Sequence, residues 1–197
     1  MTSNPLGSRL LFEICQELGE CYAQLGESDA AITNFSRALT YFPDQDRPLI
    51  GLGRLSLHEG HLEPAREFFL RAAEINAQSD EALKSLGDIC AATGRREEAL
   101  TKYQQALEIN PKNREALMVL AEVAESLHQL PRAIPFLKKY LELHLTDFEV
   151  LFRLATALYQ EGKYPEALGT LERILLFNPE NREAAALRET INHKSAN

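Results

Sequence analysis

The side chains that could support chemistry are few and scattered. The closest pair of histidines is His58 and His61, which flank a predicted turn together with Glu59. A metal site there needs more ligands than the sequence offers. Phosphate-binding Gly-x-x-x-x-Gly-Lys-Ser/Thr, dinucleotide-binding Gly-x-Gly-x-x-Gly and nucleophile Gly-x-Ser-x-Gly patterns are absent. We therefore expect no catalytic activity, no metal and no cofactor.

Composition points away from nucleic acid and membranes. With 21 basic and 29 acidic residues, the net charge is -8, whereas phosphate binding needs a basic surface. The first residues lack a secretory signal pattern, and no stretch reaches the roughly 18 apolar residues of a membrane span. Cys15, Cys21 and Cys90 are odd in number and form no Cys-x-x-Cys pair, which favours reduced thiols. We predict a cytoplasmic protein with no nucleic acid bound and no membrane insertion.

A period of 34 residues runs through the chain. One ladder is alanine throughout: Ala31, Ala65, Ala99, Ala133 and Ala167. A second ladder, mostly proline, has the same step: Pro43, Ala77, Pro111, Leu145 and Pro179. Such a period is typical of stacked supersecondary units, because each unit must meet its neighbours in the same way.

If the second ladder closes each unit, five repeats follow one another without gaps. They span residues 12–45, 46–79, 80–113, 114–147 and 148–181. Each contains two amphipathic stripes, and in four of the five a glycine that can take a positive φ at the end of the first helix separates them. We predict an all-α solenoid of antiparallel helix pairs with about eleven helices. Residues 1–11 would lead into the first helix, and residues 182–197 would form a capping helix and a frayed tail.

Small and large residues alternate where the two helices of a unit should meet. The first helices carry small residues at equivalent positions: Gly19, Gly53, Gly87, Ala121 and Ala155. The second helices carry large ones: Phe35, Phe69, Tyr103, Leu137 and Leu171. This pattern lets paired helices interlock closely.

The spacing Leu86-Gly87, Cys90, Gly94, Ala99, Tyr103, Ala106 and Pro111 resembles the tetratricopeptide repeat. The resemblance covers residues 12–181 and implies a right-handed superhelix that acts as a protein-binding adaptor or scaffold. It also implies that first helices line a concave groove. Some members of the family clamp a C-terminal carboxylate with lysine and asparagine at the fifth and ninth positions. Here Gln16 and Glu20 stand there in the first unit, so we expect no such clamp.

The resemblance places large apolar and charged side chains on the concave face. The predicted peptide-binding residues are Arg47, Ile50, Arg54, Leu57, Lys84, Asp88, Met118, Glu122, Phe152 and Tyr159. Apolar anchors surrounded by charge are suited to holding a peptide or helix of a partner. The first unit carries six acidic residues and one basic residue, so the partner could contribute basic side chains.

The N-terminal edge offers an alternative. In this family the third and tenth positions of a first helix pack on the preceding unit, yet Ile14 and Cys21 are apolar although no unit precedes them. End repeats normally have a polar outer face. Leu10, Ile14 and Cys21 therefore form a candidate edge for self-association into a homo-oligomer.

The fourth unit departs most from the pattern. His128 replaces the turn glycine, Tyr140 replaces a small residue, and Leu145 replaces the closing proline. Pro131 is tolerable in a first helical turn, but Pro135 lies four residues later and removes a backbone donor. We predict a distorted second helix in this unit.

Overall fold

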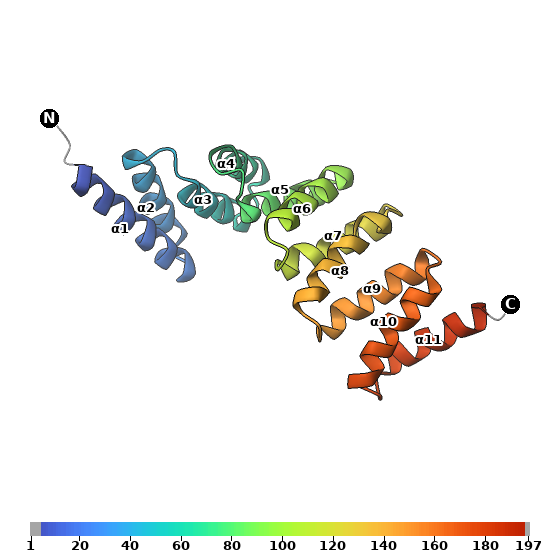
Figure 1. Ribbon diagram of the computed structural model, residues 1–197. Helices are drawn as coiled ribbons and strands as arrows, with labels where there is room; N and C mark the ends of the chain where they lie inside the picture. Colours follow the sequence, from blue (N-terminus) through green and yellow to red (C-terminus); the bar gives the residue numbers. More distant parts are fainter. Residues whose placement is uncertain (1–4, 196–197) are drawn as a thin grey trace. The chain divides into compact units, whose positions relative to one another are not determined.

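The computed structural model describes residues 5–195, and these form helices joined by short turns (Figure 1). The eleven α-helices in this part of the chain are α1 Pro5–Gln24, α2 Ser28–Tyr41, α3 Asp46–His58, α4 Leu62–Ile75, α5 Asp80–Ala92, α6 Arg96–Ile109, α7 Arg114–Ser126, α8 Ile134–Leu143, α9 Phe148–Gln160, α10 Tyr164–Phe177 and α11 Arg182–Ser195. A short 3-10 helix, η1 Leu130–Arg132, precedes α8. No strand occurs among residues 5–195, which confirms the predicted fold class and helix number.

The helices belong to two compact units, one ending at Thr93 and the other beginning at Gly94. In the first unit α1 packs on α2, α2 on α3, α3 on α4, and α4 on α5. In the second, α6 packs on α7, and the succession continues through α10 and α11. First helices of successive pairs also touch, as α1 touches α3 and α7 touches α9. In each unit, neighbouring first helices therefore form one wall.

Turn chemistry matches the sequence pattern. Gly26, Gly60, Gly94 and Gly162 have φ between 72° and 80°, which only glycine adopts without steric cost. His128 takes the same role in the fourth repeat with φ 56°. This non-glycine residue in the left-handed region marks the irregular repeat as locally strained.

Close helix approach in the first unit depends on small residues. A methyl group added at Gly19 would lie 2.6 Å from the Phe35 ring, and one added at Gly53 would lie 2.8 Å from Phe69. Both phenylalanines are buried. The predicted alternation of small and large residues therefore positions α1 on α2 and α3 on α4.

Two expectations about the ends need correction. The first helix begins at Pro5 and not after residue 11, because proline is tolerated in a first turn and nothing between Leu6 and Leu11 stops a helix. Residues 194 and 195, expected to fray, continue α11. Residues 1–4 and 196–197 of the two predicted end segments lie outside the described residues.

The predicted distortion of the fourth repeat is confirmed. Helices α2, α4, α6 and α10 each have 14 residues, whereas α8 has 10. The missing turn is the 3-10 helix η1, and Pro135 falls in the first turn of α8. A proline there interrupts no helical hydrogen bond, so the chain shortens the helix instead of kinking it.

Candidate functional site

A groove of about 610 Å³ lies within the first unit. One wall comes from the C-terminal half of α1, which contributes Glu20 and Gln24, and from Ser28 at the start of α2. The facing wall is α3, and Glu81 of α5 also lines the groove. All of the lining residues belong to α1, α2, α3, α5 and the turn between α1 and α2.

The floor of the groove lies where residue 51 of α3 is glycine and so has no side chain. Phe35 of α2 is buried beneath Gly51 of α3, and a methyl group at Gly51 would lie 2.5 Å from the ring. Any larger residue would both collide with Phe35 and fill the hollow. Gly51 and Phe35 therefore set the depth of the groove.

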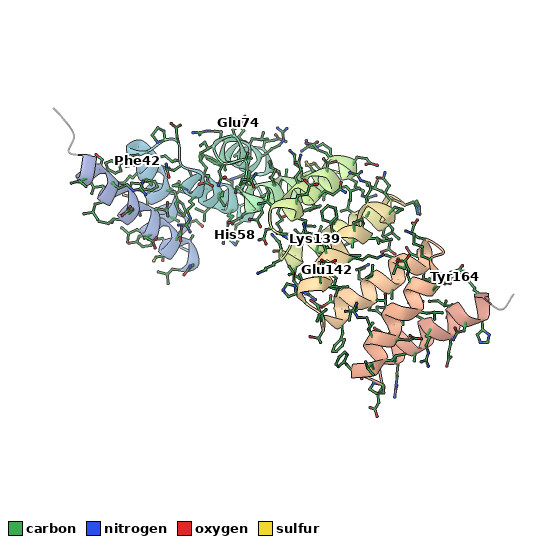
Figure 2. All side chains as sticks on the ribbon, viewed as in Figure 1. Phe42, His58, Glu74, Lys139, Glu142 and Tyr164 are labelled. Atoms are coloured by element: carbon green, nitrogen blue, oxygen red, sulfur yellow. The ribbon has the colours of Figure 1, made fainter. Side chains whose placement is uncertain are left out.

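Helix α3 presents six side chains to the groove. Arg47, Ile50, Arg54 and Leu57 are separated by steps of three, four and three, which keep them on one side of the helix, and Leu55 and His58 also line the groove. His58, labelled in Figure 2, lies at the C-terminal end of α3. The first four are predicted site residues, and the structure brings them together.

One of these residues differs from its expected role. Ile50 was expected to be an exposed anchor, but its side chain is only 7% exposed and packs in a core cluster with Leu49, Phe69 and Leu86. Leu57 is half-buried against the same cluster. Ile50 therefore supports the groove, and Leu57 is the more accessible apolar contact.

The charged groups of the groove are weakly engaged with one another. Arg54 Nη1 lies 3.5 Å from Glu81 Oε1, and the two side chains are 70% and 52% exposed. An ion pair this long and this exposed contributes little to stability. Arg47 is also exposed, so both guanidinium groups can reach a ligand without breaking a strong contact.

Two more predicted site residues lie on α5 and pair with each other. Lys84 Nζ lies 3.1 Å from Asp88 Oδ2 in an i, i+4 arrangement. Neither residue lines the groove. Their charges are therefore partly neutralised within their own helix.

The remaining predicted site residues belong to the second unit. Met118 and Glu122 lie on α7, and Phe152 and Tyr159 lie on α9. Glu122 is exposed and the other three are half-buried. The Tyr159 ring is covered by Lys194, whose Nζ lies 4.9 Å from the ring centre. The structure thus separates the predicted residues into two sets, one in each unit.

Charged residues of the second unit form a tight network at the turn between α8 and α9. Asp147 accepts hydrogen bonds from Arg114 Nε at 2.8 Å, Tyr140 OH at 3.1 Å and the Val150 N–H at 3.2 Å. Burial alone would raise the pKa of the Asp147 carboxyl, but these donors hold that pKa below its usual value. Arg114 Nη2 also donates to Glu149 at 2.5 Å. Tyr140, one of the residues that made the fourth repeat look irregular, therefore helps to secure its closing turn.

Tyr140 shows why a large residue is tolerated in that repeat. Its ring stacks on His144 with centroids 4.2 Å apart, and its hydroxyl reaches Asp147. Burial raises the pKa of the Tyr140 hydroxyl, and the neighbouring carboxylate adds to the increase. The side chain is a structural link across the turn.

Sequence reasoning missed Gly51 and Phe35 as groove residues. Phe35 was assigned to packing, and the hollow above it depends on a contact between two repeats. A signal was available, because the sixth positions of the other units are Glu17, Ser85, Val119 and Arg153, and only the second unit has glycine.

The histidine, cysteine and acidic side chains of the described residues form no metal site. No three histidine, cysteine or acidic side chains among these residues could hold a metal ion together. His61 Nδ1 lies 3.3 Å from Glu59, and the three cysteines are free, with Cys15 and Cys90 buried and Cys21 exposed. None of the helices within residues 5–195 has the length and apolar content that crossing a bilayer requires.

The predicted self-association edge is exposed. Leu10 is 58% exposed, Ile14 is 45% exposed and Cys21 is exposed as well. All three lie on α1, outside the groove lining.

Helix pairs stacked in this way are the architecture of α-solenoid repeat proteins. A model of the tetratricopeptide repeat matches residues 22–88 and 126–191, and a second TPR repeat model matches residues 87–126. The chain belongs to the tetratricopeptide repeat family. A comparison with curated protein sequences finds no significant match.

Solved structures agree on the fold. YrrB, a TPR protein with an unusual peptide-binding site, is 24% identical with a TM-score of 0.68, covering 83% of this chain and 84% of its own. PilF of Pseudomonas aeruginosa is 20% identical with a TM-score of 0.68, covering 96% and 86%. The first TPR of Spaghetti (RPAP3), bound to the HSP90 peptide SRMEEVD, is 22% identical with a TM-score of 0.56, covering 59% and 93%. These likenesses show the fold alone, that of an α-solenoid of helix pairs.

Proposed function

We propose that the chain is a non-catalytic adaptor that holds a peptide or helix of a protein partner in the groove of its first unit. The observation that carries this proposal is the hollow over Gly51 and Phe35, bordered by Arg47, Arg54 and Leu57. Two structural neighbours are described as binding peptides, which supports the same use of the fold.

The charges of the groove suggest the chemistry of the bound segment. An aliphatic side chain would sit against Leu57 in the hollow. Acidic groups of the segment would face Arg47 and Arg54 on α3, and basic groups would face Glu20 on α1. Because the two walls carry opposite charge, they would fix the direction in which the segment lies.

A pull-down from a lysate of the source cells tests the proposal with two matched charge reversals. Arg54→Glu changes the groove, whereas Arg71→Glu changes an exposed residue of α4 that does not line it. We expect the first variant to lose a captured protein that the second retains, with both melting at the temperature of the wild type. Equal loss in both variants, or no loss in either, would refute a groove-based function.

Self-association through Leu10, Ile14 and Cys21 is a second candidate, favoured by the exposure of these side chains. Light scattering of the wild type and of Ile14→Asp measures it. A larger species that the substitution removes would support this candidate, and a monomer in both cases would exclude it.

A further inference from the structure

The outward face of α1 is exposed, whereas the equivalent face of every later first helix is buried. On α1 the third, seventh and tenth repeat positions are Ile14, Leu18 and Cys21, of which Ile14 is 45% and Leu18 is 41% exposed. The equivalent residues of later repeats are all buried: Pro48, Leu52, Leu55, Ala82, Leu86, Ile89, Ala116, Leu120, Val123, Val150, Leu154 and Ala157. The same type of surface is therefore an interface in four repeats and open in the first.

The covered faces show what such a surface accepts. Leu52 and Leu55 of α3 pack against Ala31 and Phe35 of α2. In the next pair, Leu86 and Ile89 of α5 pack in one cluster with Phe69 and other side chains of α4. The occupant in each case is an α-helix that presents apolar residues one turn apart.

The stripe on α1 has the spacing of a helix-packing seam. Leu11, Ile14, Leu18, Cys21 and Leu25 alternate steps of three and four along the chain. Leu11 is 42% and Leu25 is 74% exposed, so the stripe continues beyond the three repeat positions. Five apolar residues in this register are the pattern that one helix offers to another. None of the five lines the groove, so this surface is independent of the proposed peptide site.

Charge selects the kind of helix that fits. The carboxylates of α1 are Glu13, Glu17 and Glu20, and its single basic residue among those described, Arg9, is bound to Glu13 at 2.8 Å. Glu17 lies directly before Leu18, at the border of the stripe. A second copy of α1 would bring the same carboxylates opposite these, and like charges across an interface oppose association.

Head-to-tail stacking of copies is also disfavoured. The last helix, α11, has exposed polar residues such as Glu183, Glu189 and Asn192. It offers no comparable row of exposed large apolar side chains among its described residues. A partner of different sequence therefore suits α1 better than another copy of this chain.

We propose that the outward face of α1 and the turn that follows it (Leu11, Ile14, Leu18 and Cys21 of α1, and Leu25 of the turn) docks an amphipathic helix of a partner protein that carries basic residues beside its apolar stripe. This helix takes the place that the second helix of a preceding repeat would occupy. Its apolar residues cover Ile14 and Leu18, and its basic residues face Glu17.

Two synthetic helical peptides provide the probe. Both keep the residues by which α2 packs on α3, namely Ala31, Ile32, Phe35 and Leu39. The remaining positions are lysine in one peptide and glutamate in the other. Binding to the full chain is followed by fluorescence anisotropy. We expect the lysine peptide to bind at least about tenfold more tightly, with an affinity that falls as salt is added.

Three variants of the full chain make the result specific. Ile14→Asp should abolish binding of the lysine peptide, and Glu17→Lys should reverse the preference between the two peptides. Leu145→Asp alters a residue that is 63% exposed in the second unit and should leave binding unchanged. Thermal unfolding of each variant shows that the fold is retained.

Other outcomes overturn the proposal. If neither peptide binds, or if both bind equally, the face does not accept a basic helix. If the chain alone forms a dimer that Ile14→Asp dissociates, the occupant is a second copy.

Discussion

The walls formed by the first helices of the two units differ in how their charged side chains are paired. In the first unit Arg47, Arg54 and His58 border a hollow, and Arg54 makes only a 3.5 Å contact with Glu81. In the second unit Glu125 of α7 accepts hydrogen bonds from Arg153 at 3.1 Å and from Gln160 at 2.6 Å, both on α9. The charges of one wall are open to a ligand, whereas those of the other hold neighbouring helices together.

This difference explains why the proposed binding site is placed in the first unit. A ligand for the second wall must first displace internal hydrogen bonds, and each broken charged contact costs free energy. A ligand for the first wall meets groups that are still hydrated and weakly paired. Charged residues of the first helices thus contribute to stability in one unit and remain available for recognition in the other.

The largest expected effect on stability comes from removing the aromatic ring at the floor of the groove. Phe35→Ala deletes a buried ring that packs on α1 and α3, so we expect a loss of about 3–5 kcal/mol in the free energy of unfolding. Urea unfolding followed by circular dichroism measures this. As a control, Phe177→Ala removes a ring that is 64% exposed and should change stability by about 0.5 kcal/mol or less. A similar loss for both rings would mean that Phe35 is not a core residue.

A second test measures how the free energy of unfolding depends on pH. Hydrogen-bond donors hold the pKa of the Asp147 carboxyl below its ordinary value. Ionised Asp147 therefore stabilises the second unit fully at pH values above the ordinary carboxyl pKa of about 3.9. The contribution is lost as pH falls through the lowered folded-state pKa. Asp147→Asn should cost about 1 kcal/mol at neutral pH and make unfolding less dependent on acid. Urea titrations at neutral and acidic pH measure both effects.

The control for Asp147 is Asp44→Asn, which changes an exposed carboxyl of the first unit. Its free energy of unfolding at neutral pH should stay within about 0.5 kcal/mol of the wild-type value. If the two variants behave alike, the network around Arg114 does not stabilise the turn.

The smallest expected effects test directly whether the charged residues of the two walls differ in their contribution to stability. Glu125→Ala removes the acceptor of Arg153 and Gln160, so we expect a loss of about 0.5–1 kcal/mol. Arg54→Ala removes only the long contact with Glu81 and should cost about 0.2 kcal/mol or less. Chemical unfolding of the two variants in parallel provides the measurement. Equal losses would show that the two walls are equally engaged.

The repeat period predicted most of the fold, because it reflects packing that every unit shares. It indicated the helix pairs, the turn glycines and the distorted helix after His128. It could not show that Ile50 is buried, since that depends on how closely Phe69 and Leu86 approach it. It also could not show the hollow over Gly51, which arises where a phenylalanine of one repeat meets a glycine of the next.

The start of α1 was misjudged for a related reason. Counting back from a repeat boundary places every first helix at an equivalent residue, but residues 5–11 are helical as well. The helix therefore extends to Pro5.

The predicted residues of the second unit, including Met118 and Phe152, remain predictions.

The distribution of thiols gives this molecule a natural reporter. Cys21 is exposed within the stripe on α1, whereas Cys15 and Cys90 are buried. A maleimide dye should therefore label one position in the folded protein without any engineering. Protection of that position from the dye in a cell extract would reveal when the stripe is occupied, even before the occupant has been purified.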